Sequence, residues 1–573
     1  MQSRQNRLLI LSILGISVLL LAGGLATLFL ADRVPSRSVL KIRLADSLPE
    51  RHTTGPLGRF LGWRETTVLD LVRVLDAARE DSRVRAVTIE IAGAECGPAR
   101  AQEVRQAIHR FRSSGKYVGA LLEWGSLVDF YLASAADDVF LLPGGTLDMA
   151  GLAIMVPFAR GALDHLGVIP QFEIAGEEKD APDVYMRHEM SPIMRRSLER
   201  LLDGLLSQIL DGLAADRGLD RDKLEAMVDS GFLTAPEAVE RRLADGILHE
   251  DKLAERARER TGEDLEELQL ADYLGGLAPS WFSRPPKIAL VYATGTLVSG
   301  ESDQSQWLGE LSGSESLARA FRTIREDDRI KAVVLRIDSP GGSSTASEMI
   351  WREVVLTGGE KPVVVSMGDT AASGGYFIAA GADQVLAQPT TITGSVGVFA
   401  GKFAMRGFYD WIGINWGVVK RGRNADMLMD LDPWTEEQRR LMRNGILAIH
   451  QRFQEVVATG RHLDPGTVKG LATGRIFSGE EAVRLGLADA LGGLREALQA
   501  ARSRAGLAPG EPIAVELFPR PEGLLAGLLS GASMTSGPLP PVPASEVLRQ
   551  VMLWRRLGEE RYSFYFPYRL RPR

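Results

Sequence analysis

Two glycine-flanked segments of the sequence carry residues that could perform acyl transfer. The first, Asp338-Ser339-Pro340-Gly341-Gly342-Ser343, ends an apolar β-branched run, and the second, Ala371-Ala372-Ser373-Gly374-Gly375-Tyr376, follows another such run and begins a helical pattern. Glycines allow a sharp turn and leave backbone N–H groups free to face a developing oxyanion. A small residue, a serine and two glycines are typical of an exposed nucleophile at a helix start. Tight strand-to-helix turns without chemistry would use the same residues.

A serine nucleophile needs a base, because its hydroxyl is weakly nucleophilic at neutral pH. None of the seven histidines lies in a recognisable strand-end motif, and the first one after Ser373 is His450, in a helical pattern. A lysine can replace histidine where burial lowers its pKa from about 10.4 to about 7, a bias of about 4 kcal/mol against the charged form. Spacing alone does not identify that lysine.

An internal repeat gives the two segments their context. Residues 136–143 recur as residues 382–389 at a shift of 246, and residues 233–245 recur as residues 477–489 at nearly the same shift. In the first copy Leu127 stands opposite Ser373, and Glu95-Cys96 stand opposite Gly341-Gly342. A fold that needed the serine and the glycines only for its turns would need them twice. We therefore expect the second copy to carry a chemical task that the first copy lacks.

The elements that must position these residues alternate between short β-branched runs and helical patterns. The runs expected as strands are residues 85–91, 116–122, 287–292, 330–337 and 361–366. Between the last three, residues 315–324 and 347–356 carry apolar residues at helical spacing. This alternation is typical of βα units around a buried sheet, so we predict an α/β fold with helices on both faces of the sheet.

The domain organisation follows from the repeat and from shifts in composition. We predict a cytoplasmic tip and anchor over residues 1–37, a first repeat domain over 38–278, a Pro-containing linker over 279–286 and a second repeat domain over 287–517. A Gly- and Pro-rich tail over 518–573 would contain a short apolar and basic helix near residues 545–557.

Residues 8–30 contain no charged side chain and would span about 35 Å as a helix, enough for one bilayer crossing. A secretory signal peptide is the competing interpretation, but its apolar core usually runs only about 7 to 15 residues. Positive charges on both sides of the stretch leave its orientation open. We expect an uncleaved, single-pass membrane anchor.

Composition excludes several function classes. The chain has 45% apolar and 25% charged residues, as an ordinary folded protein does, and its net charge of −7 argues against a general nucleic-acid binder. Its single cysteine, Cys96, allows neither an intramolecular disulfide nor a cysteine-rich metal site. We expect no metal, no cofactor and no nucleic-acid partner.

At residues 38–505 the chain resembles the long, two-copy form of the bacterial signal peptide peptidase A family, also called protease IV. The similar motifs of the second copy are Ser339-Pro340-Gly341-Gly342-Ser343, Met367-Gly368, Ala371-Ala372-Ser373-Gly374-Gly375-Tyr376 and Thr393-Gly394-Ser395-Val396-Gly397. In the first copy, Lys179-Asp180-Ala181 and Met190-Ser191-Pro192 are similar to the family segment with the general-base lysine. Because Lys179 faces Ala425 by the repeat shift, the two copies are complementary.

The resemblance implies two tandem crotonase- and Clp-like α/β domains and a serine protease with a Ser-Lys dyad. Ser373 would be the nucleophile and Lys179 the general base, the N–H groups of Gly374 and Gly342 would form the oxyanion hole, and Ser395 would orient the lysine. The family implies a homotetramer on the outer, periplasmic side of the bacterial cytoplasmic membrane. Its substrates are cleaved signal peptides and other unfolded apolar segments.

One departure from the family and three alternatives remain at this point. Glu177-Glu178 precede Lys179, and two nearby carboxylates would raise its pKa unless they point away. A crotonase-type acyl-thioester enzyme would not depend on Ser373. A non-catalytic membrane scaffold would not be expected to keep a serine and a lysine in opposite copies. A nucleotide site at residues 397–402 lacks the full phosphate-loop spacing.

Overall fold

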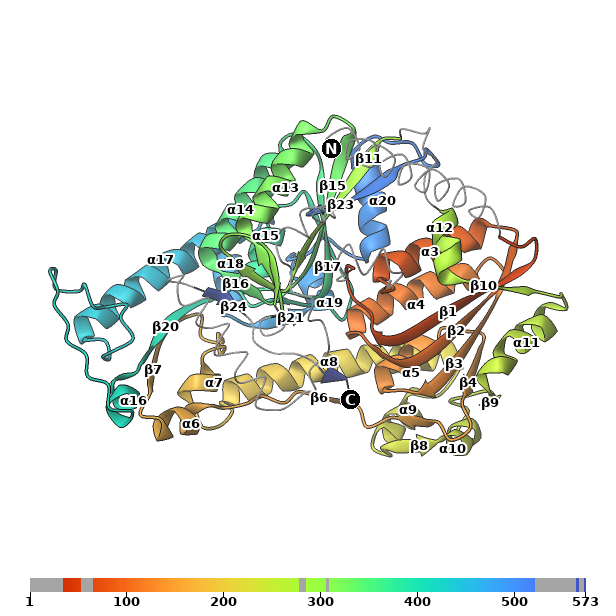
Figure 1. Ribbon diagram of the computed structural model, residues 1–573, viewed down its shortest axis with the longest axis horizontal. Helices are drawn as coiled ribbons and strands as arrows, with labels where there is room; N and C mark the ends of the chain where they lie inside the picture. The colour runs from red at the N-terminus through yellow and green to blue at the C-terminus, as the bar shows by residue number, and fades with distance from the viewer. Residues whose placement is uncertain are drawn as a thin grey trace, which may run out of the picture.

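The computed structural model describes residues 34–52, 65–277, 285–305, 309–520, 563–565 and 571–572. The expected anchor at residues 8–30 and the expected helix near residues 545–557 lie outside this part of the chain. Among the described residues, no helix is both long and apolar enough to cross a membrane. Figure 1 places the main sheet of the first repeat at the right and the second repeat at the upper centre and left, in green to blue.

The first repeat is built on a six-stranded sheet in the order β10-β1-β2-β3-β4-β9, in which all paired strands are parallel. Its strands are β1 (Ser38–Ser47), β2 (Val84–Glu95), β3 (Tyr117–Trp124), β4 (Asp138–Leu141), β9 (Gly246–Ile247) and β10 (Glu266–Gln269). Its flanking helices are α3 (Val68–Glu80), α4 (Pro98–Arg112), α5 (Leu127–Ala133) and α11 (Glu250–Thr261). Helices α3 and α4 pack on one face, and α11 packs on the other.

The second repeat is built on an eight-stranded sheet whose main path is β21-β19-β17-β15-β11-β23; β18 also pairs with β17, and β22 pairs with β18. Its strands are β11 (Lys287–Thr294), β15 (Ile330–Ser339), β17 (Val363–Ala372), β18 (Gln384–Ala387), β19 (Ile392–Gly394), β21 (Ile476–Ser478), β22 (Ala490–Leu491) and β23 (Ala514–Phe518). Its flanking helices are α13 (Ser314–Glu326), α14 (Ser344–Gly358), α15 (Gly374–Ala379) and α20 (Leu494–Arg504). The five predicted strands, two in the first repeat and three in the second, are confirmed, and so are the two helices predicted in the second repeat.

Element boundaries repeat together with the sequence. Helices α3 and α13 begin and end 246 residues apart, and so do α4 and α14. Strands β8 (Phe232–Thr234) and β21 are 244 residues apart. The internal repeat of the sequence is therefore a repeat of structure, and equivalent positions of the two copies can be compared residue by residue.

A third sheet, which the sequence did not predict, joins the two repeats. Its order is β13-β14-β12-β16-β24-β20-β7, and β7 is the strand that the first repeat supplies. Its strands are β7 (Ile169–Ala175), β12 (Thr296–Val298), β13 (Asp303–Ser305), β14 (Gly309–Gly313), β16 (Gly341–Ser343), β20 (Val398–Ala404) and β24 (Ser563–Tyr565). Strand β7 pairs antiparallel with β20 along its whole length. This pairing carries the segment after β7 into the second repeat.

The remaining elements cover the edges of the sheets or extend from them. They are β5 (Thr146–Asp148), β6 (Leu152–Ala153), α6 (Arg160–His165), α7 (Asp183–Met186), α8 (Pro192–Arg217), α9 (Arg221–Val228), α10 (Ala235–Glu240), α12 (Leu270–Gly276), α16 (Arg406–Trp411), α17 (Glu436–Gly460), α18 (Pro465–Leu471), α19 (Gly479–Arg484) and β25 (Arg571–Pro572). The long helix α8 runs beneath the second repeat, from α5 of the first repeat toward α7 (Figure 1). Side-chain caps at Ser191 and Thr435 begin α8 and α17.

Candidate active site

Ser373 stands at the turn between β17 and α15, where the strand ends and the helix begins. Its φ of 54° and ψ of −112° form a conformation that side chains rarely adopt, and strain of this kind is concentrated at functional sites. The turn is held because the Ser373 N–H donates to the Gly394 carbonyl over 2.8 Å. Glycine follows at position 374 because a Cβ there would lie 2.6 Å from Ser347 Oγ. The backbone therefore fixes where the Ser373 hydroxyl points.

Lys179 reaches this hydroxyl from the first repeat. Its Nζ lies 2.8 Å from Ser373 Oγ, 2.9 Å from Ser395 Oγ and 3.3 Å from the Ser395 carbonyl oxygen. The side chain is only 2% exposed. Burial lowers the pKa of Lys179 to about 7, against the opposing effect of the Asp180 carboxylate. A large fraction of this amine is therefore neutral at neutral pH.

The acidic neighbours of Lys179 do not prevent this shift. The Glu178 carboxylate accepts a hydrogen bond from Thr473 Oγ1 over 3.0 Å, and the Glu178 N–H donates to the Thr473 carbonyl over 2.6 Å. Glu177 is exposed. The two carboxylates that could have raised the lysine pKa thus face Thr473 and solvent. Gly474 completes the packing, since a Cβ there would lie 2.5 Å from the Lys179 backbone nitrogen.

Ser395 supplies the second hydroxyl in contact with the lysine amine. It follows β19, has a φ of 53° and is buried. Its N–H donates to the Arg475 carbonyl over 2.7 Å, which holds the turn in place. The structure thus brings Ser373, Lys179 and Ser395 together, as the resemblance implied.

The two glycine segments also meet. Gly341 has a φ of 96°, which favours glycine. A Cβ on Gly342 would lie 2.0 Å from the Leu297 carbonyl oxygen of β12, so this position admits no side chain. A Cβ added to Gly374 would lie 3.2 Å from the Gly342 nitrogen. The backbones of Gly342 and Gly374 are therefore adjacent. Two N–H groups beside a serine hydroxyl are suited to stabilise an oxyanion.

A short strand of the C-terminal tail lies beside these glycines. Strand β24 runs antiparallel to β16, with Gly342 opposite Phe564, and Phe399 of β20 lies opposite Ser563. The gap between β16 and β20 therefore accepts an extended peptide backbone. Peptides commonly bind to an open sheet edge in this way.

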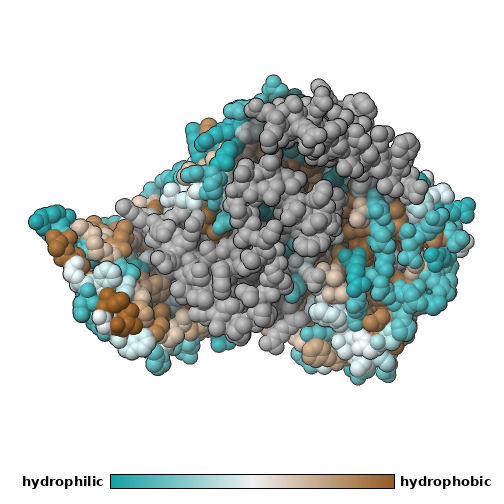
Figure 2. Space-filling model, viewed as in Figure 1, coloured by the Kyte–Doolittle hydropathy of each residue, from teal (hydrophilic) through white to brown (hydrophobic). Residues whose placement is uncertain are grey.

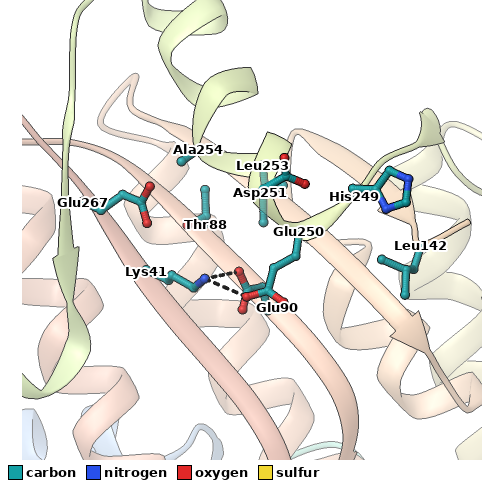
Figure 3. A pocket seen from close by; sticks show the side chains of 10 residues that line it. All are labelled: Lys41, Thr88, Glu90, Leu142, His249, Glu250, Asp251, Leu253, Ala254 and Glu267. Carbon is teal, nitrogen blue, oxygen red and sulfur yellow. Dashed lines mark hydrogen bonds and ion pairs between the residues drawn. The ribbon is translucent and has the colours of Figure 1, made fainter.

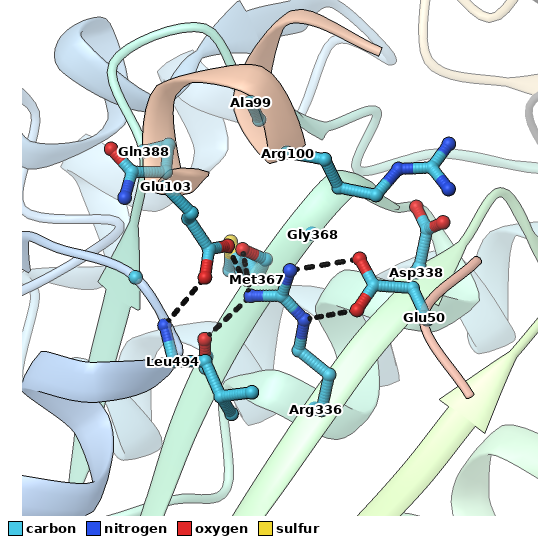
Figure 4. Close-up of polar contacts among 12 residues, drawn as sticks. Glu50, Ala99, Arg100, Glu103, Arg336, Asp338, Met367, Gly368, Gln388 and Leu494 are labelled. Carbon is cyan, nitrogen blue, oxygen red and sulfur yellow. Dashed lines mark hydrogen bonds and ion pairs between the residues drawn. The ribbon is translucent and has the colours of Figure 1, made fainter. Parts of the chain in front are cut away.

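Buried charges behind the site were not predicted from the sequence. Figure 4 shows the Arg336 guanidinium of β15 between two carboxylates of the first repeat, Glu50 and Glu103. Arg336 Nε and Nη2 each donate to Glu50 over 2.8 Å, and Nη1 lies 2.6 Å from Glu103 Oε1. Glu103 also accepts the Leu494 N–H over 2.8 Å. An arginine in an apolar strand was a signal for this contact, because a buried charge needs partners.

The equivalent face of the first repeat, on which α11 packs, carries a pocket of about 360 Å³. Figure 3 shows Lys41 paired with both Glu90 and Glu250, at distances of 2.7 Å and 3.0 Å. Glu90 is the counterpart of Arg336, so this position has opposite charges in the two repeats. None of the residues that line the pocket belongs to the group around Ser373. The pocket is therefore separate from the candidate active site.

Comparisons with known proteins find similar peptidases. A family profile described as Peptidase family S49 matches residues 110–264 and 357–508. The chloroplastic serine protease SPPA of Arabidopsis thaliana is 31% identical over 462 residues, which cover 79% of this chain and 68% of that protein. Protease 4 of Haemophilus influenzae is 30% identical over 455 residues, 76% of this chain and 73% of that protein. A putative signal peptide peptidase SppA of Enterococcus faecium is 32% identical over 203 residues, 35% of this chain and 59% of that protein.

Proposed function

Since the chain belongs to peptidase family S49 and is a serine peptidase, we propose that it cleaves peptide bonds with a dyad of Ser373 and Lys179. The observation that carries this proposal is the 2.8 Å contact between Lys179 Nζ and Ser373 Oγ. The lowered pKa of Lys179 supports a role as general base, because a base must be neutral to accept a proton. The acyl-thioester and scaffold alternatives give no account of a chain that belongs to a peptidase family.

A neutral amine can make all three contacts of Lys179 Nζ. A neutral amine has two N–H donors and one lone pair. The donors would serve Ser395 Oγ and the Ser395 carbonyl oxygen, and the lone pair would accept the Ser373 hydroxyl hydrogen. Ser395 thereby orients the lone pair toward the nucleophile.

The reaction is a two-step acyl transfer. Lys179 takes the proton of Ser373 while Oγ attacks the peptide carbonyl carbon, and it returns that proton to the leaving amine as the C–N bond breaks. Water then hydrolyses the acyl-enzyme with Lys179 again as base. The N–H groups of Gly374 and Gly342 would stabilise the oxyanion of each tetrahedral intermediate, at about 3 kcal/mol per donor.

The substrate would bind as an extended strand between β16 and β20. The position of β24 supports this, since the backbone of residues 563–565 pairs with both strands. The similarity to the putative signal peptide peptidase of Enterococcus faecium supports cleaved signal peptides as substrates. We propose cleaved signal peptides and other unfolded apolar segments as the substrate class.

Residues 8–30 would anchor the enzyme in the bacterial cytoplasmic membrane, with its body on the outer side, as in the family that the chain resembles. The uncharged 23-residue length supports the anchor. In a membrane preparation, the full chain should resist alkaline carbonate extraction, and a chain that begins at residue 34 should be released. Release of the full chain would refute the anchor.

A homotetramer is the proposed assembly. Figure 2 shows apolar atoms at the end of the molecule where Figure 1 places α16. Trp411 is 71% exposed, Trp416 54% and Val419 90%, and exposed apolar patches of this kind often mark protein contacts. Sedimentation of the anchor-free body should give four chains, and Val419→Asp should give fewer. A monomeric wild type would refute the proposal.

Hydrolysis of a fluorogenic peptide with an apolar residue before the cleaved bond tests the dyad. The anchor-free body should lose nearly all activity as Ser373→Ala and as Lys179→Ala, with unchanged far-UV circular dichroism. The exposed Lys223→Ala is the matched control and should keep full activity. Retained activity in both dyad variants would overturn the proposed function.

A further inference from the structure

Asp369 reaches from the second repeat to the start of helix α4 in the first repeat. It lies on β17, four residues before Ser373. Its carboxylate accepts the N–H groups of Gly97, Ala99 and Arg100 over 3.1, 3.0 and 3.1 Å. It also forms an ion pair with the Arg100 guanidinium. One side chain thus satisfies three helix N-terminal donors across the repeat boundary.

The equivalent helix of the second repeat begins differently. Helix α14 is capped by its own Ser343, whose Oγ accepts the Ala346 N–H over 3.1 Å. Gly97 occupies the equivalent position in the first repeat, and α4 has no side-chain cap of its own. A Cβ at Gly97 would lie 2.2 Å from the Asp369 carboxyl carbon. Helix α4 of the first repeat thus lacks a local side-chain cap, and the Asp369 carboxylate occupies the space that a side chain at position 97 would need.

A second carboxylate links the two catalytic strand ends. Asp338 is the penultimate residue of β15, shortly before Gly341 and Gly342, and its Oδ1 accepts the Thr370 N–H over 2.9 Å. Thr370 follows Asp369 and precedes the turn at Ser373. The strand ends that carry the glycines and the nucleophile are therefore joined, and Asp369 connects this unit to α4.

Arg336, on the same strand β15 as Asp338, also forms contacts between the two repeats. Figure 4 shows Asp338 and Arg100 beside the contact of Arg336 with Glu50 and Glu103. Glu50 and Glu103 belong to the first repeat, and Arg336 belongs to the second. Lys179 and Ser373 also belong to different repeats, so the distance between their side chains depends on how the two repeats pack against each other.

We propose that Asp369 is a positioning residue for peptide hydrolysis. Its cap on α4 fixes the position of the repeat that carries Lys179 relative to the turn that carries Ser373. The inference rests on the proposed dyad. A displacement of about 1 Å between reacting groups can cost about 100-fold in rate. Asp369 itself touches neither reacting atom, so it acts on the rate through the relative position of the two repeats.

Three variants of the anchor-free body separate positioning from simple helix capping. Asp369→Ala removes the cap, and Gly97→Ala displaces the carboxylate while every charge stays. The double variant Gly97→Ser/Asp369→Ala gives α4 a local serine cap, as α14 has, without the link across the boundary. Gly204→Ala in α8 is the control, because a Cβ there meets nothing within 4 Å.

We expect Asp369→Ala and Gly97→Ala to lower kcat by about 10- to 100-fold with KM changed less than about threefold. The double variant should recover the melting temperature but not kcat, and the midpoint of its pH–rate profile should differ from that of wild type.

Recovery of kcat in the double variant would reduce Asp369 to a helix cap and overturn the inference. Full kcat in Asp369→Ala, with Ser373→Ala inactive, would also overturn it while the proposed dyad stands. Activity in Ser373→Ala would instead refute the dyad.

Discussion

Lys179 Nζ lies 2.8 Å from Ser373 Oγ although 194 residues separate the two, and each belongs to a different repeat. The pairing of β7 with β20 brings them together, since it carries the end of a first-repeat strand into the second repeat. Neither repeat contains both groups, because Leu127 stands opposite Ser373 and Ala425 opposite Lys179. The duplicated fold thus supplies one complete site from two incomplete copies.

The activity should rise with pH through about 7. Burial lowers the pKa of Lys179 to about 7, and only the neutral amine can accept the Ser373 proton. The logarithm of kcat/KM should therefore increase with a slope near one below this pH and level off above it. Peptide hydrolysis measured from pH 5.5 to pH 9 checks the expectation. A profile that is flat between pH 6 and pH 8 would contradict a lysine base with this pKa.

Removal of the Ser395 hydroxyl should lower kcat by about 10-fold, since one hydrogen bond of about 1 to 1.5 kcal/mol orients the Lys179 amine. Ser395 has a φ of 53°, so alanine would add backbone strain that glycine avoids. Ser395→Gly and Ser395→Ala both lack the hydroxyl and together separate the two effects. Equal losses in kcat assign the effect to the hydroxyl. If Ser395→Gly keeps wild-type kcat, the orienting role is wrong.

Asp338→Asn should change how stability depends on pH. Burial, Asp369 and Glu50 raise the pKa of Asp338 to about 7, whereas Arg100 and the Thr370 N–H lower it. A carboxyl group with a raised folded-state pKa contributes stability that is present below about pH 4 and lost as pH rises through 7. Asparagine does not titrate, and its amide oxygen can still accept the Thr370 N–H.

The stability of Asp338→Asn relative to wild type should therefore increase by about 2 to 3 kcal/mol between pH 5 and pH 8. Urea unfolding at both pH values measures this difference. Because Glu103 and Lys179 titrate in both proteins, the comparison isolates Asp338. An unchanged difference between the two pH values would contradict the raised pKa.

Sequence patterns predicted those parts of the fold that depend on local periodicity. The apolar β-branched runs became β2, β3, β11, β15 and β17, and the helical spacings became α13 and α14. The repeat shift matched the two copies because both keep the same order of elements. The motif resemblance placed Ser373, Lys179 and Ser395 in one site.

Contacts across the repeat boundary could not be predicted in this way. Glu50 and Arg336 are 286 residues apart, and Gly97 and Asp369 are 272 apart, so no periodic pattern links them. Both contacts do leave a trace in the repeat, since Glu90 stands opposite Arg336 and Ser343 stands opposite Gly97. Differences between equivalent positions of two copies thus mark surfaces that the copies use differently.

Arg336→Met should destabilise the protein by about 3 to 5 kcal/mol, because it leaves the Glu50 and Glu103 carboxylates buried without their partner. Adding Glu50→Gln and Glu103→Gln should recover part of this loss, since neutral amides are less costly to bury. Urea unfolding of the single and triple variants checks both expectations. If the triple variant is less stable than Arg336→Met, the uncompensated charges are not the cause.

A chain that ends at Arg520 should bind peptide substrates more tightly than the full anchor-free body. Strand β24 pairs with β16 and β20, where the proposed substrate would lie, so its removal ends a competition for the same backbone edges. KM should fall several-fold, and kcat should stay within about twofold because no residue of the dyad changes. Steady-state hydrolysis of the fluorogenic peptide measures both constants.

Phe564→Pro in the untruncated body is the matched variant, since it removes one backbone N–H from the strand, and it should also lower KM. If both variants keep the wild-type KM, β24 does not compete with substrate; if both lose kcat, the strand is instead a structural part of the sheet that holds Gly342.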